Sequence, residues 1–84
     1  MQQIKKKNMI KLGKRIKAMR ISRSLNINEI VNLYGGISVA NWSRIEAGKH
    51  YNIELSTLII ISKAFSITID ELLKDINFDY TIIE

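Results

Sequence analysis

Residues 38–49, SVANWSRIEAGK, form a short amphipathic segment that decides how the rest of the chain is interpreted. Val39, Trp42 and Ile45 are three residues apart, so they share one side of a helix, and we expect that side to be buried. The opposite side carries small and polar side chains: Ala40, Asn41, Ser43 and Arg44. The segment starts with a favoured N-cap serine, and a glycine near its end favours helix termination. The sequence therefore predicts a short helix with one buried and one exposed side.

A second short helix is predicted just before this segment. Asn26 can cap a helix that starts at the next residue, and Glu29 completes a capping box. Its buried side is expected to consist of Ile27, Ile30, Val31 and Tyr34. Gly35 and Gly36 tolerate the positive φ that a sharp reversal requires. Two short helices joined by a tight turn predict a helix-turn-helix, and small outer side chains let its second helix enter a DNA major groove about 12 Å wide.

Three further helices complete the predicted domain. Residues 8–22 carry one apolar stripe: Met9, Leu12, Ile16 and Met19. Residues 55–65 are apolar on nearly all sides, which predicts the most buried helix: Leu55, Leu58, Ile59, Ile61, Ala64 and Phe65. Thr68 and Glu71 form a capping box for a helix over 69–75. The fold class is therefore all-α with five helices.

The C-terminal tail, residues 76–84, has a period of two. Its apolar positions alternate with polar ones: Ile76, Phe78, Tyr80 and Ile82. This pattern is typical of a half-buried strand, so the tail is either disordered or pairs with the same strand of a second copy. We therefore divide the chain into a basic N-terminal arm (1–8), a helix-turn-helix domain (9–75) and a tail with a possible short β-strand used in dimerisation.

Charge is distributed asymmetrically along the chain. Residues 1–49 contain eleven Lys and Arg and two Glu, a net of +9, whereas residues 50–84 contain two Lys and six acids, a net of −4. The basic end either faces phosphate or is a solvated surface. The same alternatives apply to Lys5, Lys6 and Lys7, which form either an arm along DNA or a solvated terminus.

Composition argues against several classes of protein. The chain has no Cys and one His, so we expect neither a disulfide nor a Cys or His metal site, and no cofactor. The residues suggest no nucleophile–base pair, so we do not expect an enzyme, and no small-molecule ligand is evident. With no long apolar stretch and no signal peptide, we expect a cytoplasmic protein without a membrane partner. At 84 residues a single domain has a modest core, which leaves oligomerisation as its plausible stabiliser.

Four stretches resemble the Cro/C1-type (XRE) helix-turn-helix family of DNA-binding regulators: LGKRIKAMR at 12–20, LNINEIV at 25–31, ISVANWSRIEAGK at 37–49 and NIELSTLIIISKAFSITIDELL at 52–73. The resemblance implies a five-helix lambda-repressor-like DNA-binding domain. It also implies a sequence-specific transcriptional regulator, a repressor or autoregulator, that binds double-stranded DNA at a near-palindromic operator as a homodimer. The alternative is a protein-binding module, such as an antitoxin-like or adaptor protein, which the apolar tail motivates.

The resemblance also implies roles for individual residues. The positions expected to read bases are Val39, Ala40, Asn41 and Arg44. Arg44 is the first choice, because its planar guanidinium can bond guanine O6 and N7 together. The positions expected to contact the DNA backbone are Asn26, Asn28, Ser38, Ser43 and Lys49. Arg20 and Glu46 match a structural ion pair, while His50 and Tyr51 either touch phosphate or form a surface loop.

Two features depart from the family pattern. Counting from the two flanking helices places the turn glycine at Gly35 or at Gly36, so the turn has one extra residue. The family often has Gln at the start of the second helix, where this chain has Ile27. The phosphate contact there would pass to Asn26, to Asn28 or to the helix N-terminus itself.

Overall fold

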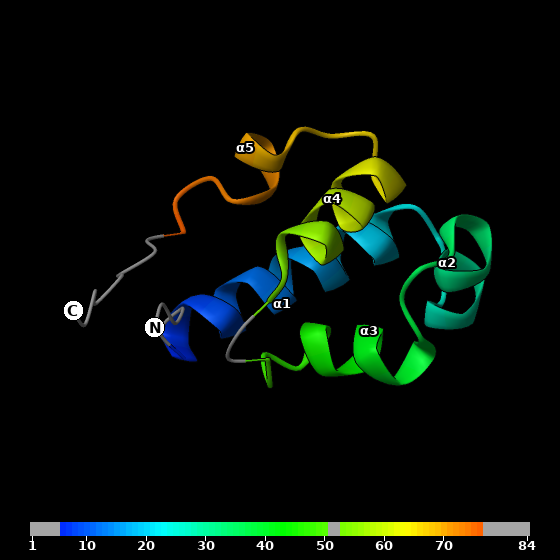
Figure 1. Cartoon of the computed structure of the whole chain (residues 1–84), viewed down its shortest axis with the longest axis horizontal. Coiled ribbons are helices and arrows are strands. Elements are labelled where there is room, and N and C mark those ends of the chain that lie inside the picture. The colour runs from blue at the N-terminus through cyan, green and yellow to red at the C-terminus, as the bar shows by residue number, and fades with distance from the viewer. Residues whose placement is uncertain (1–5, 51–52, 77–84) are drawn as a thin grey trace.

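Five helices are present in the part of the chain that the computed structural model describes, residues 6–50 and 53–76 (Figure 1). They are α1 (Lys6–Ser22), α2 (Ile27–Tyr34), α3 (Val39–Glu46), α4 (Leu55–Ala64) and α5 (Ile69–Leu72). The all-α fold class with five helices is confirmed, and the described residues contain no strand. Most of the tail for which a strand was predicted, including Phe78, Tyr80 and Ile82, lies outside the described residues.

The predicted caps set the starts of three helices. Asn26 Oδ1 accepts the Glu29 backbone N–H at 2.8 Å, and the Glu29 carboxylate accepts the Asn26 backbone N–H at 3.0 Å. Ser38 Oγ accepts a backbone N–H at 3.1 Å at the start of α3, and Thr68 Oγ1 accepts one at 3.0 Å at the start of α5. Each side chain satisfies a backbone donor that the helix itself leaves unpaired, so these three cap predictions are confirmed.

One hydrophobic core joins all five helices. Its buried members are Leu12, Ile16, Ile30, Trp42, Ile45, Leu58, Ile61, Ala64, Phe65, Leu72 and Ile76. Trp42 is 2% exposed, and its ring meets that of Phe65 edge to face with 6.1 Å between the centroids. The prediction that Trp42 is a core residue is therefore confirmed, and its indole is not available to stack on a base.

Four apolar residues are more exposed than the helical periodicity predicts: Ile59, 36% exposed, lies within α4, and the other three stand at helix ends. Tyr34 is 50% exposed, Val39 is 42% exposed and Leu55 is 64% exposed, although the pattern assigns each to a buried side. Tyr34 is the last residue of α2, while Val39 and Leu55 are the first residues of α3 and α4. A short helix contacts the core mainly through its central turn, so the periodicity fails at its ends.

The boundaries of the helices also differ slightly from those predicted. α1 begins at Lys6, so the end of the predicted 1–8 arm belongs to the helix. α4 ends one residue earlier than expected, and α5 ends at Leu72 rather than near Asp75. Ile76, predicted to begin a dimerisation strand, is 6% exposed and packs in the core of its own chain. Its side chain therefore stabilises the domain and does not belong to a free strand.

The turn between α2 and α3 contains two consecutive glycines, both with positive φ. Gly35 has a φ of 65° and Gly36 a φ of 84°, a backbone region that other residues rarely adopt. A Cβ at Gly36 would also lie 2.8 Å from Ile60 Cδ1 of α4. Both positions therefore favour glycine.

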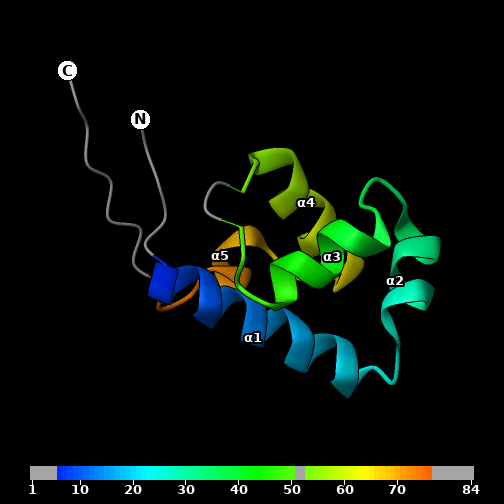
Figure 2. The ribbon, with the colours of Figure 1, turned by 90° about the horizontal axis from the view of Figure 1, so that it is seen from below.

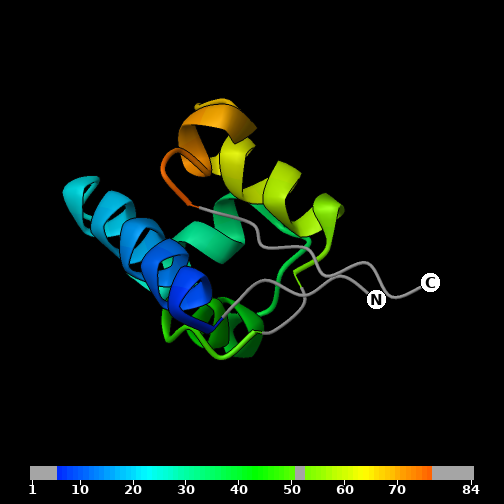
Figure 3. The ribbon, with the colours of Figure 1, turned by 90° about the vertical axis from the view of Figure 1, so that its left-hand side faces the viewer.

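The arrangement of the helices leaves one side of α3 uncovered. In Figure 3, α1 and α4 lie between α5 above and α3 below. Figure 2, seen from below, shows α3 in front with α1 alongside it. α3 therefore lies at one surface of the domain, opposite α5.

α1 and α3 pack closely because Gly13 has no side chain. A Cβ built at Gly13 would lie 2.4 Å from the carbonyl oxygen of Ile45 and 2.6 Å from that of Glu46. Both are backbone atoms, so any larger residue would force the two helices apart. Gly13 thus fixes how α3 sits on the domain, a role that the sequence analysis did not identify.

Candidate nucleic-acid interface

The outer side of α3 is formed by small and polar side chains. Its exposed members are Val39, Ala40, Asn41, Ser43 and Arg44. The side chains of Asn41 and Arg44 make no hydrogen bond or ion pair with any other described residue. The division between the two sides of the helix is therefore as predicted, except that Val39 joins the exposed side. This surface has hydrogen-bonding groups that its own chain does not use.

The inner side of α3 is held by hydrogen bonds as well as by apolar packing. Arg20 Nε donates to Glu46 Oε2 at 2.6 Å, and Arg20 Nη2 donates to Glu46 Oε1 at 2.9 Å. Trp42 Nε1 donates to the same Glu46 Oε2 at 2.5 Å. The expected ion pair is therefore present, in the two-pronged geometry that makes such pairs strong. It ties the last turn of α3 to α1.

The charge of Arg20 is secured by this contact. The pKa of its guanidinium is raised, mainly because of its hydrogen bond to Glu46; burial lowers the pKa and the attraction of the Glu46 charge raises it. A cation with a raised pKa contributes stability below its ordinary pKa and loses it only as pH rises through the folded-state value. Arg20 therefore stays charged in the physiological pH range.

Two of the predicted backbone contacts lie at the start of α2. Asn26 and Asn28 are both exposed. The side-chain oxygen of Asn26 is used as the helix cap, which leaves its NH₂ group to donate outward. Glu29 places a carboxylate beside the same helix start. The side-chain NH₂ groups at the start of α2 are therefore accessible to a phosphate. The negative charge of Glu29 partly offsets the attraction of the helix N-terminus for an anion.

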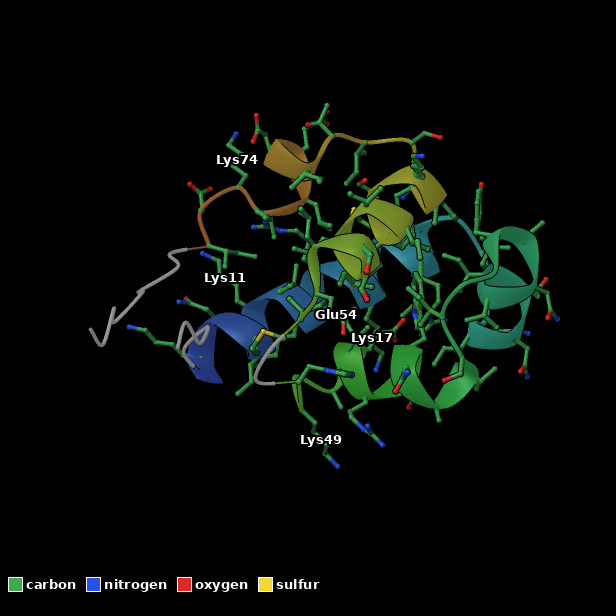
Figure 4. The ribbon with its side chains drawn as sticks, in the orientation of Figure 1. Lys11, Lys17, Lys49, Glu54 and Lys74 are labelled. Carbon is green, nitrogen blue, oxygen red and sulfur yellow. The ribbon has the colours of Figure 1, made fainter. Side chains whose placement is uncertain are left out.

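The chain reverses immediately after α3. The Lys49 backbone N–H bonds the Arg44 carbonyl oxygen at 3.0 Å, which fixes Lys49 beside the last turn of the helix. Its side chain extends away from the domain (Figure 4). His50 differs, because its Nε2 is buried and has no hydrogen-bond partner among the described residues. His50 also lines a cavity of about 290 Å³ between α3 and α4. Tyr51 lies outside the described residues.

Two cations of α1 are bonded to the end of α5 and to the segment just after it. Lys11 Nζ donates to the Asp75 carbonyl oxygen at 2.6 Å, and Arg15 Nη1 donates to the Leu72 carbonyl oxygen at 2.8 Å. Such contacts satisfy carbonyl groups that have no partner within the helix and match the negative end of its dipole. Lys11 and Arg15 therefore hold α5 on α1.

A third cation stabilises the end of α4. Arg23 Nη2 donates to the Phe65 carbonyl oxygen at 2.9 Å, and its guanidinium carbon lies 4.9 Å from the centre of the Phe65 ring. The charge pattern of the sequence indicated one basic surface in this region. The structure assigns several of them to internal contacts instead.

Within the ranges 6–50 and 53–76, no helix is long and apolar enough to span a membrane. The same residues bring together no group of three or more His, Asp or Glu side chains that could hold a metal ion.

Comparison with known proteins identifies both a family and structural neighbours. The family model described as the Cro/C1-type HTH DNA-binding domain matches residues 11–77. No curated protein matches the chain.

Solved structures match most of the chain. The restriction-modification controller protein C.AhdI from Aeromonas hydrophila has a TM-score of 0.69 at 22% identity, over 76% of this chain and 94% of that chain. The competence regulator ComR from Streptococcus vestibularis has a TM-score of 0.75 at 23% identity, over 83% of this chain. ComR from S. thermophilus has a TM-score of 0.74 at 26% identity, over 82% of this chain. The match spans only 23% of either ComR chain, so this chain corresponds to one part of those proteins.

Proposed function

Because the chain belongs to the Cro/C1-type helix-turn-helix DNA-binding domain family, we propose that it is a sequence-specific transcriptional regulator. It binds a near-palindromic operator as a homodimer and acts as a repressor or autoregulator. The observation that carries the proposal is the outer side of α3. Asn41 and Arg44 are exposed there and unpaired among the described residues, on a helix whose inner side is fixed by the contact between Arg20 and Glu46.

The chemistry of this surface suits direct reading of base edges. Arg44 can donate two hydrogen bonds to guanine O6 and N7, and Asn41 can bond adenine N6 and N7. Val39 and Ala40 offer methyl groups to the C5-methyl group of thymine. The exposure of Val39, which its place at the start of α3 explains, supports this role.

The surrounding polar side chains suit contacts with phosphate. The candidates are Asn26, Asn28, Ser38, Ser43 and Lys49. Ser38 Oγ accepts a hydrogen bond as the cap of α3, and its hydroxyl proton can still be donated to a phosphate oxygen. Contacts of this kind fix the register of the protein on the duplex without carrying sequence information.

A dimer is required for selectivity, because one helix reads only about three or four base edges. Two half-sites about 34 Å apart would double that number. We place the dimer contact in the tail beyond the buried Ile76, through Phe78, Tyr80 and Ile82. Removal of residues 77–84 should leave a folded monomer in sedimentation experiments, and an unchanged dimer would contradict this assignment.

Selection of bound duplexes from a random library tests the function itself. We expect enrichment of two inverted half-sites whose centres are about 10 base pairs apart. As a control, the selection is repeated with Lys63→Ala, which removes an exposed cation of α4. This variant should enrich the same sequence as the wild-type chain. A selection that enriches no sequence at all would contradict the proposed function.

A further inference from the structure

From Lys11 onward, the cations of α1 and of the segment just after it fall into two sets according to their partners. Four basic side chains on or just after this helix are bonded to the protein itself: Lys11, Arg15, Arg20 and Arg23. Lys14 and Lys17 are exposed and make no hydrogen bond or ion pair with any other described residue. Lys14 and Lys17 therefore make no polar contact that stabilises the described part of the fold.

Lys14 and Lys17 lie closer to α3 than Lys11 and Arg15 do, while Arg20 faces α3 directly and is paired there. Gly13, whose Cα approaches the Ile45 and Glu46 carbonyl oxygens, marks the side of α1 that faces α3. At 100° per residue, Lys17 lies about 40° and Lys14 about 100° around the helix axis from Gly13. Lys11 and Arg15 lie about 160° away, on the side of α5. In Figure 4, Lys17 accordingly lies toward α3 and Lys49, whereas Lys11 lies toward α5 and Lys74.

The charged residues on the edge of α1 beside α3 are all basic, and the exposed Ile10 and Ile21 lie among them. α1 contains no acidic residue, and the Glu46 carboxylate of α3, which faces α1, is already paired with Arg20. Two unpaired ammonium groups on one edge of a helix attract an extended polyanion, since each can neutralise one phosphate and release a counterion.

We propose that Lys14 and Lys17 form a second phosphate-binding edge, which contacts the DNA backbone beside the groove that α3 enters. This inference rests on the proposed function, because it needs the outer side of α3 to face DNA. Lys49 at the end of α3 and this edge of α1 would then follow the same backbone strand. The ligand is the phosphate backbone alone, so these two lysines contribute affinity without sequence preference.

The test is the salt dependence of DNA binding by the full chain. Log K falls as log salt rises, so the slope is negative. Lys14→Gln combined with Lys17→Gln should make this slope less steep by about 1.8, that is 0.9 for each phosphate contact. Affinity at 100 mM salt should fall on the order of tenfold for the selected operator and for a random duplex alike. The matched control combines Lys63→Gln with Lys74→Gln, which removes the same charge from two exposed lysines of α4 and the segment after α5.

Each outcome decides between the two proposals. The inference is supported by three results together. The salt dependence of the double variant is less steep than that of the control, its preference for the operator is kept, and it unfolds at the same urea concentration as the control. It is overturned if the double variant and the control have equal slopes while the wild-type chain still prefers the operator. If the wild-type chain shows no preference for any duplex, the proposed function fails and this inference fails with it.

Discussion

The two sides of α3 differ in what holds their side chains in place. On the inner side, Trp42 and Ile45 are packed in the core and Glu46 is bonded to both Arg20 and Trp42. On the outer side, Asn41 and Arg44 have no partner among the described residues. The inner side therefore determines where the helix lies, and the outer side is left free to make contacts with a ligand. Substitutions on the two sides should consequently affect different measurements.

Trp42→Ala should have the largest effect on the inner side. It removes the edge-to-face contact with Phe65 and the hydrogen bond to Glu46, and it leaves a cavity in the core. We expect a loss of about 3–5 kcal/mol in the free energy of unfolding, measured by urea denaturation. Trp42→Phe, which keeps an aromatic ring, should lose clearly less. A change below about 1 kcal/mol for Trp42→Ala would show that the inner side does not hold the helix.

Arg20→Met should cause the next largest loss in the free energy of unfolding. It leaves the largely buried Glu46 carboxylate with only the Trp42 N–H as a partner, so we expect a loss of about 3 kcal/mol. Lys17→Met, at an exposed and unpaired cation of the same helix, is the matched control and should change stability by less than about 0.5 kcal/mol. Equal thermal stabilities for the two variants would contradict the role given to the ion pair.

Arg44→Ala should separate binding from stability on the outer side. The free energy of unfolding should change by less than about 0.5 kcal/mol, because the side chain has no partner among the described residues. Preference for the operator over a random duplex should fall by about 1–3 kcal/mol, measured by fluorescence anisotropy. An equal loss of affinity for both duplexes would exclude a base-reading role for Arg44.

Lys49→Ala should have the smallest effect on DNA binding. It separates residues that contact phosphate from residues that read bases. Lys49 lies past the end of α3 and is expected to meet phosphate, so affinity should fall to the same degree on operator and random DNA. The slope of the salt dependence should decrease by about 0.9. Loss of operator preference alone would move Lys49 into the base-reading set.

Sequence reasoning succeeded where the deciding interactions are local or belong to a recognisable pattern. The caps at Asn26, Ser38 and Thr68 depend on neighbours within three residues, so the sequence contains all the information that they need. The pairing of Arg20 with Glu46 is not local, and only the family resemblance indicated it.

The features that the sequence did not predict depend on which helices become neighbours in space. Periodicity places Lys11 and Arg15 on one side of α1, but it does not show that the end of α5 lies there. The close contact at Gly13 likewise follows from the packing of α1 on α3. Periodicity also fails for Val39 and Leu55, since both start short helices that contact the core mainly through their central turns.

The most direct test of the account is a map of amide chemical-shift changes as the selected operator duplex is added to the chain. We expect the largest changes along the outer side of α3, at Ala40, Asn41, Ser43 and Arg44, and at Lys49 just beyond it. Exposed residues of α5 on the opposite surface, such as Asp70, should change least. If the largest changes occur on α4 and α5 while α3 is unaffected, DNA binds elsewhere and α3 is not the reading helix.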